Sequence, residues 1–478
     1  MTTGGSNAQQ LDPAGAGTGE HSDAPVRWLA ANGDAADFIE LHFTDVAGTL
    51  KSVVLPRSQL EETLAYGHWF DGSALEGGAR LLETDLLLRP DLRTWGLLPW
   101  VEATGERTGR FICDVATPAG EPYPADPRAV LRRVVQEAAE LGFHYHVASE
   151  VEFFLLRPPR ITSQGSARPL DSGGYFDQPL PPAERPTEAM VAALEALGVP
   201  VDASHHEIGQ GQHEIDLPLL PALEAADALV TCKFVVKSIA RRRGLLATFM
   251  PKPLAETAGS GLHLHQVLAD RQGQDVFWDP ADEHGLSATA RAFLAGQLAH
   301  ARAMCAVLAP TVNSYKRLGR GFDAPSTIGW SDANPQAMIR LSGRRGRRQT
   351  HRPDTLAGGV GTLALELRCP DPSCNPYLAL AVALAAGLDG IRSAMEPPAP
   401  LAPPPAAGGP AATAEEEQVE LLPVSLGEAI GELEWDPVVR AALGAPVYER
   451  LVMAKEQEWQ AYRRQISAWE LERYLESS

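Results

Sequence analysis

Ionisable residues recur two positions apart in three separate segments of this 478-residue chain. Apolar residues occupy the intervening positions, which is typical of β-strands with one apolar and one functional face. The pairs are Glu150 with Glu152, His263 with His265, and Glu366 with Arg368. A sheet that combines these strands would gather the charged side chains on one face.

Two further glutamates, Glu207 and Glu214, flank a turn rich in Gly and Gln in the segment HHEIGQGQHEID. Five clustered carboxylates repel one another, and protonating all of them at pH 7 would require large pKa shifts, so bound cations are the simplest explanation. Oxygen-rich ligand sets suit Mg²⁺ or Mn²⁺, and one imidazole is compatible with either ion. Two such ions would suit phosphoryl transfer. A single glutamate on a strand is usually just exposed to solvent. Simple exposure does not explain why ionisable residues recur on three strands and a turn.

Two local signals indicate the domains that must position these residues. Residues 38–43 alternate in hydrophobicity, and a second apolar run, LKSVVL, follows a turn signal at residues 45–48. This pattern predicts a β-hairpin that opens a small N-terminal domain. Asp126 and Pro127 then form a helix start, with periodic apolar residues up to a stop at Gly142, so a larger domain begins near this helix.

Two segments have too little complexity to pack a core. Residues 1–24 are rich in Gly, Ala and small polar residues and are predicted to be disordered. Residues 397–414, PPAPLAPPPAAGGPAATA, are predicted to form an exposed loop.

The composition excludes several classes of function. A formal net charge of -20, from 61 acidic and 41 basic residues, argues against binding nucleic acid or an anionic membrane. No signal peptide is recognisable at the start, and the longest apolar stretch, residues 377–388, is shorter than the roughly 20 residues that a membrane span needs. The cysteines form no paired framework and are expected to be buried, inert thiols: Cys113, Cys232, Cys305, Cys369 and Cys374. A cytoplasmic, soluble protein is expected.

A series of motifs runs through the chain from about residue 35 to the C-terminus: FDGSALEG, LRPD followed by Pro99-Trp100, SEVEFFLL, HHEIGQGQHEID, TFMPKP, GSGLHLH, NSYKRL, APSTIGW and ELRCPDPSCNPYLALA. In this order they resemble the type I glutamine synthetase family. The resemblance implies an α+β fold, with a small β-grasp domain over residues 25–122 and a catalytic domain over residues 123–478 that has a curved antiparallel sheet flanked by helices. It also implies a homododecamer of two hexameric rings, with active sites between neighbouring subunits.

The resemblance implies two metal sites that together hold two or more Mg²⁺ or Mn²⁺ ions. All six ligand positions of the family are kept: Glu152, Glu207 and Glu214 for one site, and Glu150, His263 and Glu366 for the other.

The resemblance also implies how the substrates bind. Arg317, Arg368 and the backbone at Gly259 match glutamate-binding positions, and guanidinium groups suit carboxylates because they donate two parallel hydrogen bonds. Arg340 and His265 match residues near the nucleotide phosphates. The implied reaction is phosphorylation of the glutamate γ-carboxylate by ATP, which makes a poor acyl donor reactive towards an amine.

The nitrogen site departs from the family pattern. Ammonia-using relatives carry a glutamate at the position of Asp323, in GFDAP, where an acidic group takes a proton from the attacking amine. Aspartate is shorter by one carbon–carbon bond, about 1.5 Å, which makes room for a substituent on the nitrogen. Asp71 and Asp85, which match ammonium-binding residues supplied by a neighbouring subunit, are retained, but Ala74 and Gly78 replace a serine and an aromatic residue.

Other departures affect substrate contacts and regulation. Ala258 replaces an asparagine that contacts the amino acid, and Pro335 replaces an arginine that contacts phosphate. A nearby cluster could supply a replacement, although such charge runs usually form a solvated loop: Arg344, Arg345, Arg347, Arg348 and Arg352. No tyrosine occurs in residues 415–422, where some bacterial relatives are adenylylated, so that control is not expected.

These observations lead to a γ-glutamyl-amine ligase as the first hypothesis, with a small organic amine of the polyamine or ethanolamine type as nitrogen donor. Ordinary glutamine synthesis from ammonia is the alternative within the class, because the acidic pocket residues remain. A different two-metal phosphoryl-transfer enzyme, such as a kinase, and a non-catalytic regulatory relative are the alternatives from other classes.

Overall fold

A computed structural model of the chain describes residues 28–29, 32, 35–75, 84–101, 105–158, 167–181, 184–319, 324–343, 363–403 and 420–477. Residues 397–403 of the predicted loop form neither helix nor strand. Several features of the sequence lie outside the described residues: residues 1–24, Gly78, Asp323, the arginines of residues 344–352, and residues 404–419.

The N-terminal domain is one mixed sheet with short helices. Its strands are β1 (Phe38–Thr44), β2 (Leu50–Pro56), β3 (His68–Asp71), β4 (Asp85–Pro90), β5 (Gly96–Leu97) and β6 (Thr108–Ala116), and its helices are η1 (Arg57–Gln59), α2 (Leu60–Tyr66), η2 (Gly72–Leu75) and η3 (Leu92–Thr94). The strand order is β2-β1-β6-β4-β3, with β5 paired to β6. The predicted hairpin is confirmed, because β1 and β2 pair antiparallel, whereas β1 and β6 run parallel.

The second domain contains the strands that carry the ionisable pairs. They belong to one sheet made of β7 (His144–Arg157), β8 (Arg168–Pro169), β9 (Ala203–His206), β10 (Gln212–Pro221), β11 (Leu246–Thr248), β12 (Leu262–Ala269), β13 (Thr327–Ser331), β14 (Ala337–Ser342) and β15 (Ala364–Leu367). The order is β13-β14-β15-β12-β7-β10-β9, and β8 and β11 also pair with β7. The strands pair antiparallel except β13 and β14, which are parallel.

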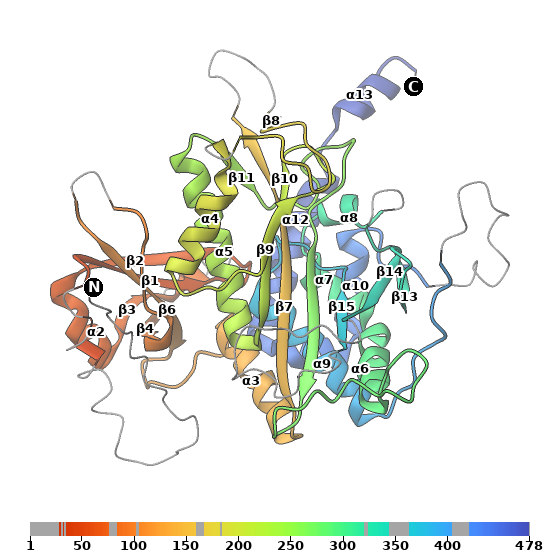
Figure 1. Cartoon of the computed structure of the whole chain (residues 1–478), viewed down its shortest axis with the longest axis horizontal. Helices are drawn as coiled ribbons and strands as arrows, with labels where there is room; N and C mark the ends of the chain where they lie inside the picture. Colours follow the sequence, from red (N-terminus) through yellow and green to blue (C-terminus); the bar gives the residue numbers. More distant parts are fainter. Residues whose placement is uncertain are drawn as a thin grey trace, which may run out of the picture.

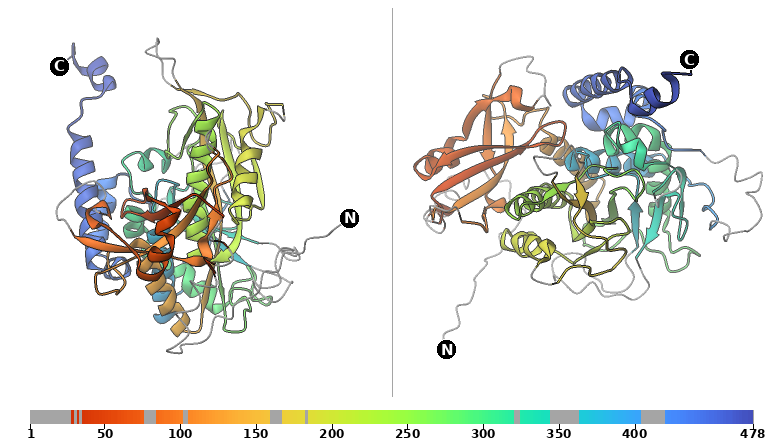
Figure 2. Two further views of the ribbon diagram at one scale, coloured as in Figure 1. Left: turned by 90° about the vertical axis from the view of Figure 1, so that its left-hand side faces the viewer. Right: turned by 90° about the horizontal axis from the view of Figure 1, so that it is seen from above.

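The second domain also contains eleven described helices, several of which pack on this sheet and build the core behind it (Figures 1 and 2). They are α3 (Pro127–Glu140), α4 (Pro186–Ala196), α5 (Ala222–Arg242), α6 (Ala288–Ala299), α7 (Ala301–Leu308), α8 (Ser314–Arg317), α9 (Pro376–Arg392), α10 (Leu426–Trp435), α11 (Pro437–Leu443), α12 (Ala445–Arg463) and α13 (Ala468–Tyr474). The helix predicted after Asp126 is α3: the Asp126 side chain caps it, and Gly142 follows its end with φ of 90°. Figure 1 shows α13 extending away from the rest of the molecule.

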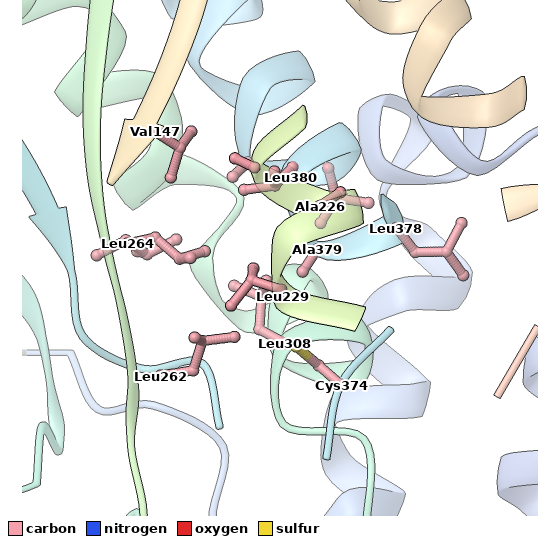
Figure 3. Packing of buried hydrophobic residues seen from close by; sticks show 14 of the residues in the cluster. Val147, Ala226, Leu229, Leu262, Leu264, Leu308, Cys374, Leu378, Ala379 and Leu380 are labelled. Carbon is pink, nitrogen blue, oxygen red and sulfur yellow. The ribbon is translucent and has the colours of Figure 1, made fainter. Parts of the chain in front are cut away.

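The apolar side of the sheet faces α5 and α9. Figure 3 shows Val147, Leu262 and Leu264 from the sheet packed towards Leu229 of α5 and Leu380 of α9. Burying a large aliphatic side chain contributes about 1.5–3 kcal/mol, and this cluster holds many of them. The long apolar stretch at residues 377–388 is therefore explained by α9, which is buried along most of its length.

The cysteines and the apolar helices match what the sequence predicts for them. All five cysteines are free and buried, as expected. Among the described residues, no helix combines the length and apolar character that crossing a membrane requires.

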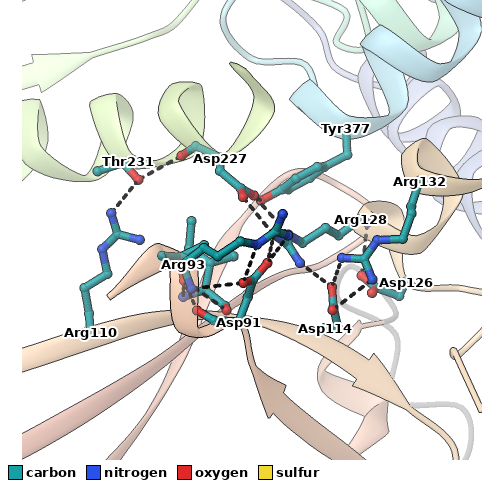
Figure 4. Close-up of polar contacts among 12 residues, drawn as sticks. Asp91, Arg93, Arg110, Asp114, Asp126, Arg128, Arg132, Asp227, Thr231 and Tyr377 are labelled. Atoms are coloured by element: carbon teal, nitrogen blue, oxygen red, sulfur yellow. Dashed lines mark hydrogen bonds and ion pairs between the residues drawn. The ribbon is translucent and has the colours of Figure 1, made fainter. Parts of the chain in front are cut away.

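A buried arginine joins the two domains (Figure 4). Arg128, in the first turn of α3, pairs with Asp91 and Asp114 of the N-terminal domain and with Asp227 of α5. Its side chain is 3% exposed, and Tyr377 of α9 donates a hydrogen bond of 2.7 Å to Asp227. One guanidinium thus pairs with three carboxylates and links the N-terminal domain to the catalytic domain.

Replacing Arg128 by alanine should lower the free energy of unfolding by about 3–5 kcal/mol, because it leaves buried carboxylates without their cation. Arg132→Ala is the control: Arg132 also contacts Asp114 but its side chain is 47% exposed, so its loss should cost within about 1 kcal/mol. Chemical denaturation monitored by circular dichroism measures both. Equal losses in the two variants would contradict the role given to Arg128.

Candidate active site

The polar side of the catalytic sheet opens onto a cavity of about 300 Å³. Every glutamate and histidine predicted as a metal ligand lines it, together with the predicted substrate residues Arg317, Arg368 and Gly259 and the predicted phosphate-binding Arg340. The alternation of each strand explains this arrangement, since the intervening residues of β7, Val151 and Phe153, are fully buried on the other side.

Strand register sets which of these side chains are neighbours. Opposed residues of antiparallel strands have Cβ atoms about 4.5–5.5 Å apart, so each row across the sheet brings charged groups together. The rows are Glu214 with Glu152; Asp216 with Glu150 and His263; and His265 with Glu366 and Arg340.

The turn between β9 and β10 holds one of the glutamates in place. Gly211 has φ of 69°, and a Cβ there would lie 2.8 Å from the carbonyl oxygen of Leu155, so the close turn requires glycine. The next residue, Gln212, is buried, and its Nε2 donates to Glu152 Oε2 at 2.7 Å. The backbone N–H of Gly261 donates to the same oxygen at 2.9 Å. The Gly/Gln turn therefore orients Glu152 as well as separating Glu207 from Glu214.

Two cavity residues, His205 and Asp216, were not predicted from the sequence. His205 bridges two glutamates, with Nδ1 3.4 Å from Glu207 Oε1 and Nε2 3.2 Å from Glu214 Oε1. Asp216 also lines the cavity, and its Oδ1 is buried without a hydrogen-bond partner among the described residues. Strand alternation could have predicted that both side chains face the cavity, because position 205 shares a face with 207 and position 216 shares a face with 214.

Potential ligand atoms lie within 4.8 Å of one another in three groups at this cavity, within the described ranges. The groups are Glu150, His265 and Glu366; Glu150, Glu214 and His263; and His205, Glu214 and Asp216. Glu150 and Glu214 are each shared between two groups, whereas the sequence prediction assigned them to separate sites.

Opposing pKa shifts follow from this crowding. Burial and the neighbouring carboxylates Glu152 and Glu150 raise the pKa of Glu214 to about 11. Burial also acts to raise the pKa of Glu150, but hydrogen bonds from His263 and His265, each 2.9 Å long, hold it below its ordinary value. On this face the histidines stabilise the ionised form of Glu150, whereas burial and the neighbouring carboxylates destabilise the ionised form of Glu214.

The donor set fits divalent cations. It consists of carboxylates with a few imidazoles, which suits Mg²⁺ or Mn²⁺. Glu366 Oε1 is buried and accepts no hydrogen bond from the described residues, although it lies 3.2 Å from Arg368 Nε and 3.7 Å from His263 Nδ1. A buried carboxylate oxygen without a donor is a natural position for a cation contact.

Hydrogen bonds and ion pairs within the chain hold the side chains of the three predicted arginines, Arg317, Arg368 and Arg340. Arg317 is 4% exposed and donates to the carbonyl oxygens of residues 368, 369 and 370 at 2.9–3.2 Å. Arg368 donates through Nη1 to the carbonyl of Pro335 at 2.7 Å. Arg340, whose side chain is 41% exposed, pairs with Glu366. The cavity therefore has cationic groups beside its carboxylates.

The remaining predicted residues take varied positions. His265 joins Glu150 to Ser342, with a 2.7 Å contact to the serine hydroxyl. Gly259 packs against the backbone, because a Cβ there would lie 2.4 Å from the carbonyl oxygen of Pro251. Ala258 lines the cavity, as does Ala324, the residue after Asp323.

The two predicted ammonium-site aspartates lie in the N-terminal domain. Asp71 of β3 and Asp85 of β4 are paired in register, and both are exposed. They are not among the residues that line the cavity of their own chain. Ala74 lies close by in η2.

Comparisons with known proteins match both domains. The family model "Glutamine synthetase, beta-Grasp domain" matches residues 35–118, and "Glutamine synthetase, catalytic domain" matches residues 124–474. Glutamine synthetase of Thermus thermophilus is 45% identical over 93% of this chain and 97% of its own length, and glutamine synthetase of Thermotoga maritima is 43% identical over 92% and 96%.

Solved structures agree with this assignment. A structure described as "GmaS/ADP complex-Conformation 1" has a TM-score of 0.78 and 32% identity, covering 94% of this chain and 99% of its own. A "novel glutamine synthase homolog" has a TM-score of 0.76 and 26% identity, covering 92% and 97%. The predicted α+β fold, with a β-grasp domain and a catalytic domain built on a curved sheet and helices, is confirmed. Two matched domains and relatives aligned over nearly their whole length show that this chain belongs to the glutamine synthetase family of ATP-using carbon–nitrogen ligases.

Proposed function

We propose that this chain phosphorylates the γ-carboxylate of glutamate with ATP and transfers the acyl group to a small organic amine. The observation that carries the ligase chemistry is the single cavity wall on which carboxylates, histidines and arginines meet. Two anions must react there, so each needs nearby positive charge before a bond can form.

The residues of this chain divide between two steps. Arg317 and Arg368 are assigned to glutamate, and Arg340 and His265 to the phosphates of ATP. A γ-carboxylate oxygen attacks the γ-phosphorus and the bond to ADP breaks; then the amine nitrogen attacks the acyl carbon and phosphate leaves. Mg²⁺ or Mn²⁺ held by the six predicted ligands would neutralise the charge of the transferring phosphoryl group.

An organic amine as nitrogen donor is proposed from the residues around the acceptor site. Asp323 is assigned to take the proton of the attacking amine, and it is one methylene shorter than the glutamate of ammonia-using relatives. Its neighbour Ala324 lines the cavity with a small side chain, and Ala74, which the family pattern places at the nitrogen site, is small as well. A shorter base with small neighbours leaves volume for a carbon substituent.

Ammonia is the second candidate donor. The relatives of 45% and 43% identity are called glutamine synthetase, which favours it. Asp71 and Asp85, both exposed, remain as acidic groups for ammonium. As the family resemblance implies, we assign them to the cavity of a neighbouring subunit in a homododecamer of two hexameric rings. They do not line the cavity of their own chain, which agrees with this assignment.

Steady-state phosphate release with ATP, glutamate and Mg²⁺ should distinguish the donors. The panel is ammonia, methylamine, ethanolamine and putrescine. We expect kcat/KM at least about tenfold higher for one of the organic amines, the smallest discrimination that a methylene-sized pocket difference typically produces. Faster turnover with ammonia than with every organic amine would remove the proposal and leave glutamine synthesis.

Glu366→Gln and Glu150→Gln should each lower phosphoryl transfer by about 100-fold or more, since even residues behind a metal ligand contribute 10–100-fold. The change preserves size and removes the charge. ADP formation and Mn²⁺ binding by electron paramagnetic resonance measure the effect. Glu195→Gln on the exposed side of α4 is the matched control. Normal ADP formation in the Glu366 or Glu150 variant would refute the metal assignment.

Asp323→Ala should slow amide formation by about 10²–10⁴-fold, the range of general-base catalysis, while a rapid-quench burst of ADP persists. Asp323→Glu should retain the base but shift preference from the organic amine towards ammonia, because it fills the space of one methylene. If the ADP burst and amide formation fell equally in Asp323→Ala, the role as base would be wrong.

A further inference from the structure

A second cluster of metal-binding residue types lies on the opposite face of the β9–β10 hairpin from the active-site glutamates. His206 precedes Glu207 and His213 precedes Glu214, so alternation turns the two histidines away from the cavity. Their Cα positions are partners in the β9–β10 register. Asp171, which follows β8, completes the cluster.

The three side chains are spaced as ligands of one ion. His206 Nε2 lies 2.8 Å from Asp171 Oδ1, and His213 Nε2 lies 3.8 Å from Asp171 Oδ2. Ligand atoms at about 2.1 Å from a tetrahedral ion are roughly 3.4 Å from one another. The two separations, which run to the two oxygens of Asp171, lie on either side of that value, and one ligand atom from each residue lies within 4.8 Å of the others. Small side-chain rotations would therefore bring three ligand atoms to a shared ion.

Two atoms of the cluster have no hydrogen-bond partner among the described residues. They are Asp171 Oδ2 and His213 Nε2, and both are buried. The side chains are 3% and 9% exposed, and they face each other. Native structures rarely leave buried polar atoms unpaired unless an ion, a ligand or ordered water satisfies them.

The other atoms of the cluster are already oriented by the backbone. His206 Nδ1 lies 2.6 Å from the carbonyl oxygen of Glu207, which can only accept, so Nδ1 donates to it. Nε2 faces the cluster and donates to Asp171 Oδ1 at 2.8 Å, and an ion bound there would displace the Nε2 proton. Metal-binding histidines are held in this way, with the second ring nitrogen donating to a carbonyl or carboxylate. Asp171 Oδ1 accepts from the backbone N–H groups of Gly173 and Gly211 at 3.1 and 3.3 Å, which fixes the carboxylate.

A cavity of about 380 Å³ is lined by all three residues. It gives an ion a route of entry and leaves room for a water molecule as a fourth ligand. His205 lines both this cavity and the active-site cavity, so the two lie on either side of the same strand.

We propose that Asp171, His206 and His213 bind one first-row transition-metal ion, with Zn²⁺ as the best match to two imidazoles and one carboxylate. The ion joins the β9–β10 hairpin to the segment after β8 and so stabilises the hairpin that carries Glu207 and Glu214. The site differs in ligands and face from the active-site ions, and it does not depend on which amine is the substrate.

The test uses the full-length chain and metal content as its readout. Protein equilibrated with micromolar Zn²⁺ in millimolar Mg²⁺ is passed through gel filtration in Mg²⁺ buffer, and zinc is measured by mass spectrometry. Wild type should retain one more zinc per chain than either His213→Gln or Asp171→Asn. Zinc should also raise the melting temperature of the wild type but not of the two variants.

His300→Gln is the matched control, because His300 also lies between two aspartates, Asp389 and Asp436, but hydrogen-bonds to them through both ring nitrogens. It should retain as much zinc as the wild type. Equal zinc in the wild type and in the Asp171 and His213 variants, or no zinc retained by the wild type, would overturn the site and leave an ordinary histidine–aspartate pair. If the variants do not fold, Co²⁺ added to wild type in excess Mg²⁺ decides: strong visible absorption of a four-coordinate ion supports the site, and its absence overturns it.

Discussion

Carboxylates on one face of the catalytic sheet repel one another, and the rest of the structure must hold them together against this repulsion. Burial and its neighbours raise the pKa of Glu214 to about 11, because the crowding disfavours its anionic form. A well-packed support helps to hold such groups together. The apolar reverse face of the sheet, packed on α5 and α9, provides that support.

Positive groups at the cavity are ordered in advance of any substrate. Arg317 is buried and fixed by three carbonyl oxygens, while Arg368 is held between Glu366 and the carbonyl of Pro335. Such preorganisation matters because donors that are already oriented cost nothing to reorganise during reaction. The backbone carbonyl of Pro335 therefore helps to orient Arg368.

The β9–β10 hairpin and Arg128 at the domain junction each contact two different regions of the protein. The hairpin presents Glu207 and Glu214 to one cavity and His206 and His213 to the other. At the junction, Arg128 binds carboxylates from both domains and so helps to hold the N-terminal sheet against the catalytic domain.

The sequence alone determined which residues share a face, because alternation along a strand depends only on local chain geometry. It therefore predicted Glu150 with Glu152, the β1–β2 hairpin and the start of α3, and its motifs indicated the family. Register between distant strands depends on how the core packs, so only the tertiary structure decided that Glu366 lies between His265 and Arg340, or that Glu150 and Glu214 are each shared between ligand groups. The contact of Asp171 with His206 was likewise invisible in the sequence, since it joins residues 35 positions apart through the pairing of β8 with β7, of β7 with β10 and of β10 with β9.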